Sequence, residues 1–178
     1  MLDKLYITPR QWLHILRWVL YTLLFLLAMM TQTVIFGNRT LFGAHPDFVP
    51  VVITCVCLRE GPERGGLYAL LCSLIWCLSG ADQGSVCIAV LTVLPILGSL
   101  LCRAVLSNRF VPCLGLTFLT LFTEQTVMFL LRYFFGTMDG SLFWRTLLPC
   151  VLVSMLAQPA VYFLVKRIAK IGDAYEST

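Results

Sequence analysis

Apolar residues fill six runs along this chain, and short stretches rich in polar residues or glycine separate them. Such runs predict membrane helices, because a helix rises about 1.5 Å per residue and about 20 residues cross a hydrocarbon core of about 30 Å. We predict helices over residues 12–36, 48–58, 65–79, 85–106, 110–135 and 142–165. The pattern therefore predicts an all-α integral membrane protein with six transmembrane helices in one bundle.

The second run, 48–58, is the shortest of the six. Pro46 and Asp47 precede it, and Arg59-Glu60-Gly61 follows it. As a straight helix it reaches roughly 16 Å, about half of a hydrocarbon core. Lipid cannot satisfy the backbone groups that a short segment leaves without partners. We therefore expect the other helices to pack around this segment.

The composition agrees with a membrane protein. Hydrophobic residues make up 59% of the chain and charged residues 12%, whereas a soluble domain carries about 25% charged residues. We expect one transmembrane domain over 12–165, between a cytoplasmic head over 1–11 and a cytoplasmic tail over 166–178. Membrane lipid is an expected partner and nucleic acid is not.

The thirteen lysine and arginine residues divide unevenly between the two ends of the predicted helices. The side of the chain termini holds Lys4, Arg10, Arg17, Arg59, Arg64, Arg103, Arg109, Lys166, Arg167 and Lys170. The opposite side holds Arg39, Arg132 and Arg145. The positive-inside rule then places both termini in the cytoplasm. The bias would largely vanish if the second segment did not cross, so the charges favour a crossing.

The residues that usually perform chemistry form no recognisable pattern. No Cys-x-x-Cys occurs, and neither histidine has zinc-ligand spacing. We interpret the eight cysteines as small packing residues. Motifs of phosphate-binding loops, metalloproteases and serine hydrolases are also absent. The sequence therefore predicts neither a catalytic site nor a cofactor.

Glu124 is an acidic residue in the middle of the predicted fifth helix. A carboxylate at that depth is expensive unless it is paired or protonated. A polar stripe accompanies it, formed by Thr117, Thr120, Thr123 and Gln125. We expect Glu124 to face the bundle interior, where it either bonds across helices to lock the fold or contacts a ligand, a proton or a partner. Arg132 follows roughly 12 Å along the same face, near enough to share water with it.

The turn at 59–64 is the most charged stretch of the chain. Its four charged residues are Arg59, Glu60, Glu63 and Arg64. They could pair with one another, or they could simply form a solvated cytoplasmic turn.

Small residues recur along one face of the predicted third helix. They are Gly66, Ala69, Ser73 and Cys77, at spacings of three and four. Such a face lets two membrane helices approach closely. It predicts either ordinary packing within the bundle or a docking face for a partner helix.

The order of these features resembles the MreD family of rod-shape-determining membrane proteins. The resemblance extends from about residue 25 to 170. Its first part is Gln32-Thr33, Pro46-Asp47, Leu58-Arg59-Glu60-Gly61, Gly65-Gly66-Leu67-Tyr68, Ser79-Gly80 and Gly84. Its second part is Leu147-Leu148-Pro149, Gln158-Pro159, Tyr162-Phe163-Leu164 and Lys166-Arg167. Family members often carry an Asp in the third helix, but this chain has no acid there before Asp82, so no role is expected for that group.

The resemblance implies a non-catalytic scaffold of the complex that directs lateral wall synthesis and rod shape, in the bacterial cell membrane. Its partner would be an MreC-like bitopic protein, with the elongation polymerase, its transpeptidase and an actin-like filament acting indirectly. The implied fold is similar to the substrate-binding S component of energy-coupling-factor transporters. A vitamin-binding S component is therefore the alternative function, and it would need a polar, aromatic pocket near the outer face. The candidate partner-binding or structural residues are Pro46, Asp47, Arg59, Glu60, Gly61, Gly66, Ala69, Ser73, Cys77, Glu124, Arg132, Pro149, Gln158, Pro159 and Tyr162.

Overall fold

The computed structural model describes residues 9–36, 45–80, 85–104, 110–136 and 143–173. Within these ranges the chain is helical and contains no strand, which confirms the all-α prediction. The elements are α1 (Pro9–Met30), a π-helical turn η2 (Thr31–Ile35), α2 (Phe48–Glu60), α3 (Pro62–Leu78), α4 (Val86–Ala104), α5 (Phe110–Phe134) and α6 (Phe143–Asp173). Most of the predicted head, the end of the tail and parts of four connections lie outside the described residues.

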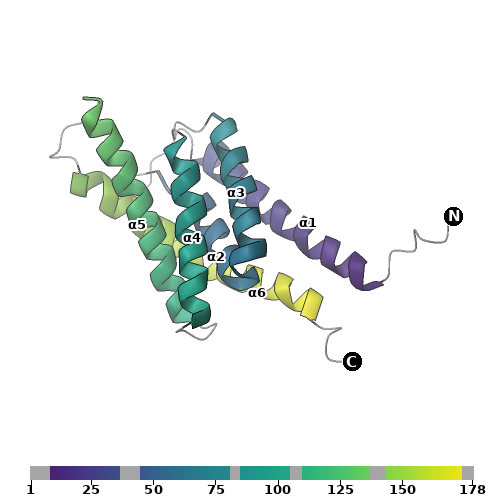
Figure 1. Ribbon diagram of the computed structural model, residues 1–178. Helices are drawn as coiled ribbons and strands as arrows, with labels where there is room; N and C mark the ends of the chain where they lie inside the picture. The colour runs from purple at the N-terminus through teal and green to yellow at the C-terminus, as the bar shows by residue number, and fades with distance from the viewer. Residues whose placement is uncertain (1–8, 37–44, 81–84, 105–109, 137–142, 174–178) are drawn as a thin grey trace.

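Helix α2 forms the centre of the bundle. Helices α3, α4 and α5 stand side by side on one side of it, and α1 and α6 cover the other (Figure 1). All five of these helices contact α2, and every residue from 49 to 58 is buried. The expectation that the other helices surround this short segment is confirmed.

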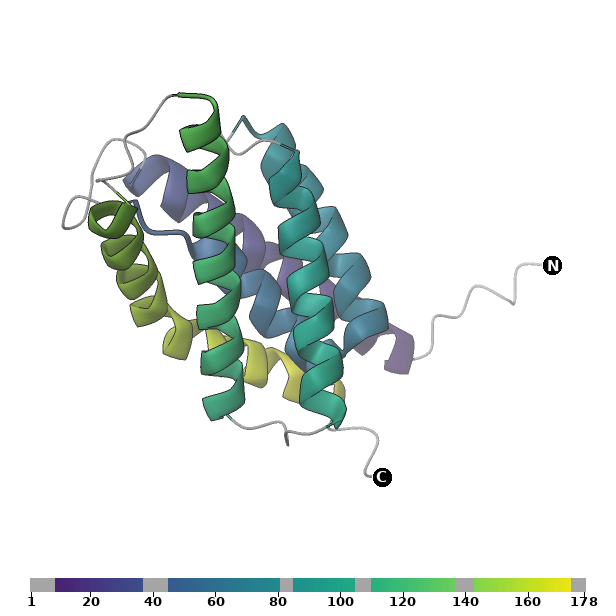
Figure 2. The same ribbon diagram turned by 60° about the vertical axis from the view of Figure 1, so that its left-hand side comes forward.

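The helices run alternately between two ends of the bundle (Figures 1 and 2). One end holds Asp47, just before α2, and we call it the Asp47 end. The other holds Glu60, the last residue of α2, and we call it the Glu60 end. The start of α1, the end of α4 and the end of α6 all lie at the Glu60 end.

A single residue, Gly61, joins α2 to α3. Its φ of 94° lies in the region that glycine adopts without steric penalty. Its backbone N–H bonds to the Cys57 carbonyl at 2.9 Å, and Pro62 then opens α3, where a missing N–H costs nothing. Both helices therefore extend further into the charged stretch than predicted, and the solvated turn shrinks to one glycine.

The small-residue face of α3 packs inside the chain. A Cβ added to Gly66 would lie 2.9 Å from the Ile96 side chain of α4, and the Ser73 and Thr92 hydroxyls are 3.2 Å apart. Ala69 is also buried, and Cys77 is half-buried. A partner helix has no access to the first three positions, so the docking-face hypothesis is corrected in favour of ordinary packing.

Helix α6 is the longest element and curves across the bundle (Figure 2). Pro149 and Pro159 lie inside it, and such residues remove a helical hydrogen bond and bend a helix. The helix continues to Asp173, past its predicted end at 165. It does so because Val165 and Ala169 are still buried against the bundle.

Among the described residues, three helical stretches are long and apolar enough to cross a membrane, namely Gln11–Ile35, Phe110–Phe134 and Leu147–Ile171. A shorter apolar stretch covers Val86–Cys102. Helix α3 exposes large apolar side chains on its outer side, among them Leu67, Leu71 and Leu78. These features are those of a membrane protein, in which lipid covers the outward-facing apolar surface.

Candidate functional site: two buried polar networks at the ends of helix α2

The first network surrounds the carboxylate of Asp47. Oδ1 accepts a hydrogen bond from Gln32 Nε2 at 2.6 Å. Oδ2 accepts bonds from Gln125 Nε2 and from Cys150 Sγ, the latter at 3.5 Å. The donors come from η2, α5 and α6, so one carboxylate connects three elements to the start of α2.

The same residues cap α2. The Asp47 side chain makes no cap bond itself; instead Gln32 Oε1 accepts the backbone N–H groups of Phe48 and Val49, at 3.0 and 3.3 Å. The Asp47 N–H donates to Ser154 Oγ at 2.8 Å. The first N–H groups of a helix have no partner within the helix, and lipid offers none. The network therefore lets a short helix begin inside the bundle.

Gln32 lies within the π-helical turn η2. A π-helix is rare, and it is frequently found at functional sites. Here it ends the first helix and presents an amide that contacts both the Asp47 carboxylate and the α2 backbone.

Burial raises the pKa of the Asp47 carboxyl above its ordinary value. The hydrogen bonds from Cys150 and Gln32 and the positive charge of Arg132 lower this pKa in part. The charge of Arg132, at the exposed end of α5, thus affects the pKa of Asp47. From the sequence, Arg132 was expected to share water with Glu124.

Glu124 lies beside this network and faces the bundle interior, as predicted. Its side chain is 1% exposed, and Oε1 accepts a bond from Cys87 Sγ at 3.4 Å. Oε2 has no hydrogen-bond partner among the described residues. A thiol is a weak donor, so this single bond contributes little to holding α4 against α5.

We expect Glu124→Leu to leave the melting temperature of the purified chain unchanged or slightly raised. The reason is that leucine removes a buried oxygen without a partner and gives up only one weak bond. Glu124→Gln, which keeps an acceptor for Cys87, is the matched variant. Circular dichroism during heating measures the effect. A fall of several degrees for leucine alone would mean that Glu124 locks the fold.

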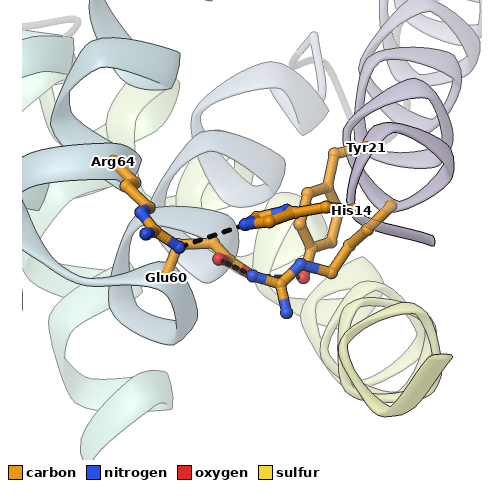
Figure 3. A network of polar contacts seen from close by, with 5 residues as sticks. His14, Tyr21, Glu60 and Arg64 are labelled. Atoms are coloured by element: carbon orange, nitrogen blue, oxygen red, sulfur yellow. Dashed lines mark hydrogen bonds and ion pairs between the residues drawn. The ribbon is translucent and has the colours of Figure 1, made fainter. Parts of the chain in front are cut away.

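The second network surrounds Glu60 at the other end of α2. Its Oε2 pairs with Arg17 Nη2 at 2.5 Å, and its Oε1 accepts the Tyr21 hydroxyl at 2.8 Å (Figure 3). The Arg17 and Glu60 side chains are 13% and 4% exposed, so the ion pair is largely buried. Tyr68 of α3 donates to the Tyr21 carbonyl at 2.9 Å. These bonds fasten α1 to α2 and α3.

Two further contacts support the same attachment. Arg64 Nη1 lies 3.2 Å from His14 Nε2, and Figure 3 shows the two side chains directed at each other. The Trp18 ring packs edge-on against Tyr21, with centroids 5.8 Å apart. The sequence left open whether the charged residues of 59–64 pair with one another or form a solvated turn. In the structure Glu60 and Arg64 both contact α1.

The remaining candidates are scattered. Gln158 is buried within α6, and its Nε2 lies 3.7 Å from Cys113 Sγ. Pro46 is buried beside Asp47, whereas Tyr162 packs on the Phe110 ring near the Glu60 end, with centroids 5.1 Å apart. The structure thus brings Pro46, Asp47 and Glu124 to one end of the bundle and Arg59, Glu60 and Gly61 to the other.

Sequence reasoning missed several members of both networks. Arg17 and Tyr21 stand four residues apart on α1, and Cys150 and Ser154 stand four apart on α6. Residues four apart share a helix face, so each set indicates a polar stripe directed into the bundle.

The described part of the chain contains no cluster of three or more His, Cys, Asp or Glu residues that could hold a metal ion. None of the eight cysteines, all of which are described, forms a disulfide. The fold and the two networks define an all-helical membrane protein with polar connections at both ends of a buried helix. No family model, curated protein or solved structure matches this chain.

Proposed function

We propose that this chain is a non-catalytic membrane scaffold of the MreD type, which supports lateral wall synthesis and rod shape in the bacterial cell membrane. One observation carries the proposal. Five of the residues on which the MreD resemblance rests take part in the contacts that hold α2 in the bundle, namely Gln32, Asp47, Glu60, Gly61 and Gly65. The shared pattern is therefore a pattern of structural support.

The chemistry of the two networks agrees with this role. The Asp47 carboxylate is occupied by two amides and a thiol, and the Glu60 carboxylate by a guanidinium and a phenol. Groups engaged in this way position helices. The proposed partner is an MreC-like single-pass protein, and its contact would fall on outward-facing helix surfaces, because the small face of α3 is buried.

We further propose that all six helices cross the membrane and that both termini are cytoplasmic. The basic residues support this orientation. Five basic residues lie toward the Glu60 end, namely Arg17, Arg59, Arg64, Lys166 and Arg167. Arg132 lies in the last turn of α5, at the Asp47 end. The positive-inside rule then makes the Glu60 end cytoplasmic.

Depletion of the protein in its host tests the function. We expect rod-shaped cells to swell or become round, because the wall-synthesis complex loses its membrane scaffold. A plasmid copy of the natural chain should restore the rods. The vitamin-transport alternative expects cells of normal shape that require a vitamin, and that result would end the scaffold proposal.

Co-purification from native membrane is the second test of the scaffold role. A single-pass membrane protein should accompany the natural chain. Its absence after mild solubilisation, with the chain still folded, would contradict the proposed partner.

A further inference from the structure

The last turns of α6 carry a basic face at the Glu60 end. Lys166, Arg167 and Lys170 are exposed, while Val165 and Ala169 of the same turns are buried against the bundle. With Phe163 the three cations line a hollow of ≈ 200 Å³. The four residues stand at spacings of three and four, so they occupy one side of the helix.

A second, smaller hollow shares Lys166 with the first. It has a volume of ≈ 30 Å³, and α2, α4, α5 and α6 all line it. Arg59 and Lys166 are its cations, and the Tyr162 ring lies 6.0 Å from Lys166 Nζ. Most of its remaining lining is apolar, including Leu58 and Val165. Lys166 therefore stands between a small, mainly apolar hollow and a larger basic one.

Glu60, the last residue of α2, does not neutralise this basic face. Both Glu60 oxygens are already engaged, one by Arg17 and the other by Tyr21. Among the described residues no ion pair involves Lys166, Arg167 or Lys170, so these charges are available to an external anion.

The position of the face indicates the kind of anion. Phe163 is 58% exposed and Leu164 is 46% exposed, near the end of the apolar stretch Leu147–Ile171, which also includes Lys166, Arg167 and Lys170. One turn further the exposed side chains are lysine and arginine. A change from apolar to basic surface is typical of the level at which lipid headgroups lie, where Lys and Arg attract anionic lipid.

We propose that the hollow formed by Phe163, Lys166, Arg167 and Lys170 binds the phosphate headgroup of an anionic phospholipid, with an acyl chain lying along the apolar surface of α6. The larger hollow has room for a phosphate group, whereas the smaller has room for little more than a water molecule. This site rests on the membrane character of the chain and is independent of the scaffold role.

The test titrates the full chain, purified in a neutral detergent, with phosphatidylglycerol and with phosphatidylcholine, and native mass spectrometry measures bound lipid. We expect phosphatidylglycerol to bind more tightly. Lys166→Gln and Arg167→Gln should each weaken its binding about fivefold, because each removes one attractive charge, and should leave phosphatidylcholine binding unchanged. Both side chains are exposed, so the melting temperature should not change.

Arg132→Gln is the matched control, since it removes an exposed positive charge at the opposite end of the bundle. It should retain phosphatidylglycerol binding. An equal loss in the control would show a general charge effect and would overturn the site. Equal binding of soluble glycerol phosphate would show that the hollow binds a free phosphate compound. Displacement of the lipid by an acidic peptide would show that it binds a protein segment. Either result overturns the proposal.

Discussion

Asp47→Leu is expected to destabilise the folded chain by about 2–4 kcal/mol. The substitution leaves the amides of Gln32 and Gln125 without their acceptor inside the bundle. A buried donor that loses its partner costs about 1–3 kcal/mol. These two amides are half-buried, so each contributes toward the lower part of that range. Asp47→Asn retains one oxygen and the side-chain volume, so we expect a loss of roughly half that size. Thermal unfolding in detergent, followed by circular dichroism, gives both values.

A double-mutant cycle separates the network from a simple change of volume. Gln125 donates to Asp47 in the structure. The double variant Asp47→Leu/Gln125→Leu should therefore lose clearly less unfolding free energy than the sum of the two single variants, because the second substitution removes the amide that the first left without an acceptor. Additive losses would mean that the two side chains act independently. The network would then not be the feature that secures the start of α2.

The apolar pattern predicted the helices well because the bundle is built from long apolar runs. It also predicted the burial of 48–58, because a segment too short to cross lipid must be covered by protein. The helix ends were harder to predict. Pro9 and Pro62 begin helices, where proline is tolerated, and α6 continues to Asp173 because Val165 and Ala169 still have partners in the bundle.

The polar networks could be predicted only in part, since their partners are distant in the sequence. Glu60 pairs with Arg17, 43 residues earlier, and Asp47 bonds to Gln125, 78 residues later. The orientation of Glu124 followed from the polar stripe on its own helix, a local pattern. The capping role of Gln32 depends on the π-helical turn and on the position of α2 in space, and neither is written in the local sequence.

The close packing of α3 against α2 also depends on tertiary contacts, which the local sequence does not reveal. The sequence placed Gly66 on the small-residue face of the third helix, but it did not indicate what either Gly65 or Gly66 would contact. In the structure Gly65 faces the backbone of α2, and Gly66 faces a side chain of α4. This difference predicts unequal effects for the same substitution at adjacent positions.

Gly65→Ala is expected to destabilise the chain by about 1–3 kcal/mol, a typical penalty for overpacking. The added Cβ would lie 2.6 Å from Cys57 Cα and 2.9 Å from its carbonyl oxygen, so the two helices would have to move apart. Because α2 also holds the Asp47 and Glu60 networks, a shift of its axis would disturb both. Thermal unfolding measures the loss.

Two other glycines provide graded controls. Gly66→Ala should cost less, because its Cβ meets only the end of the Ile96 side chain, at 2.9 Å, which can move to another rotamer. Gly115→Ala in α5 should be neutral or stabilising by up to about 1 kcal/mol, since nothing lies within 4 Å of its Cβ and alanine favours a helix. A Gly65→Ala variant as stable as Gly115→Ala would show that α2 and α3 are not in backbone contact, and the support for α2 would then rest on its polar networks alone.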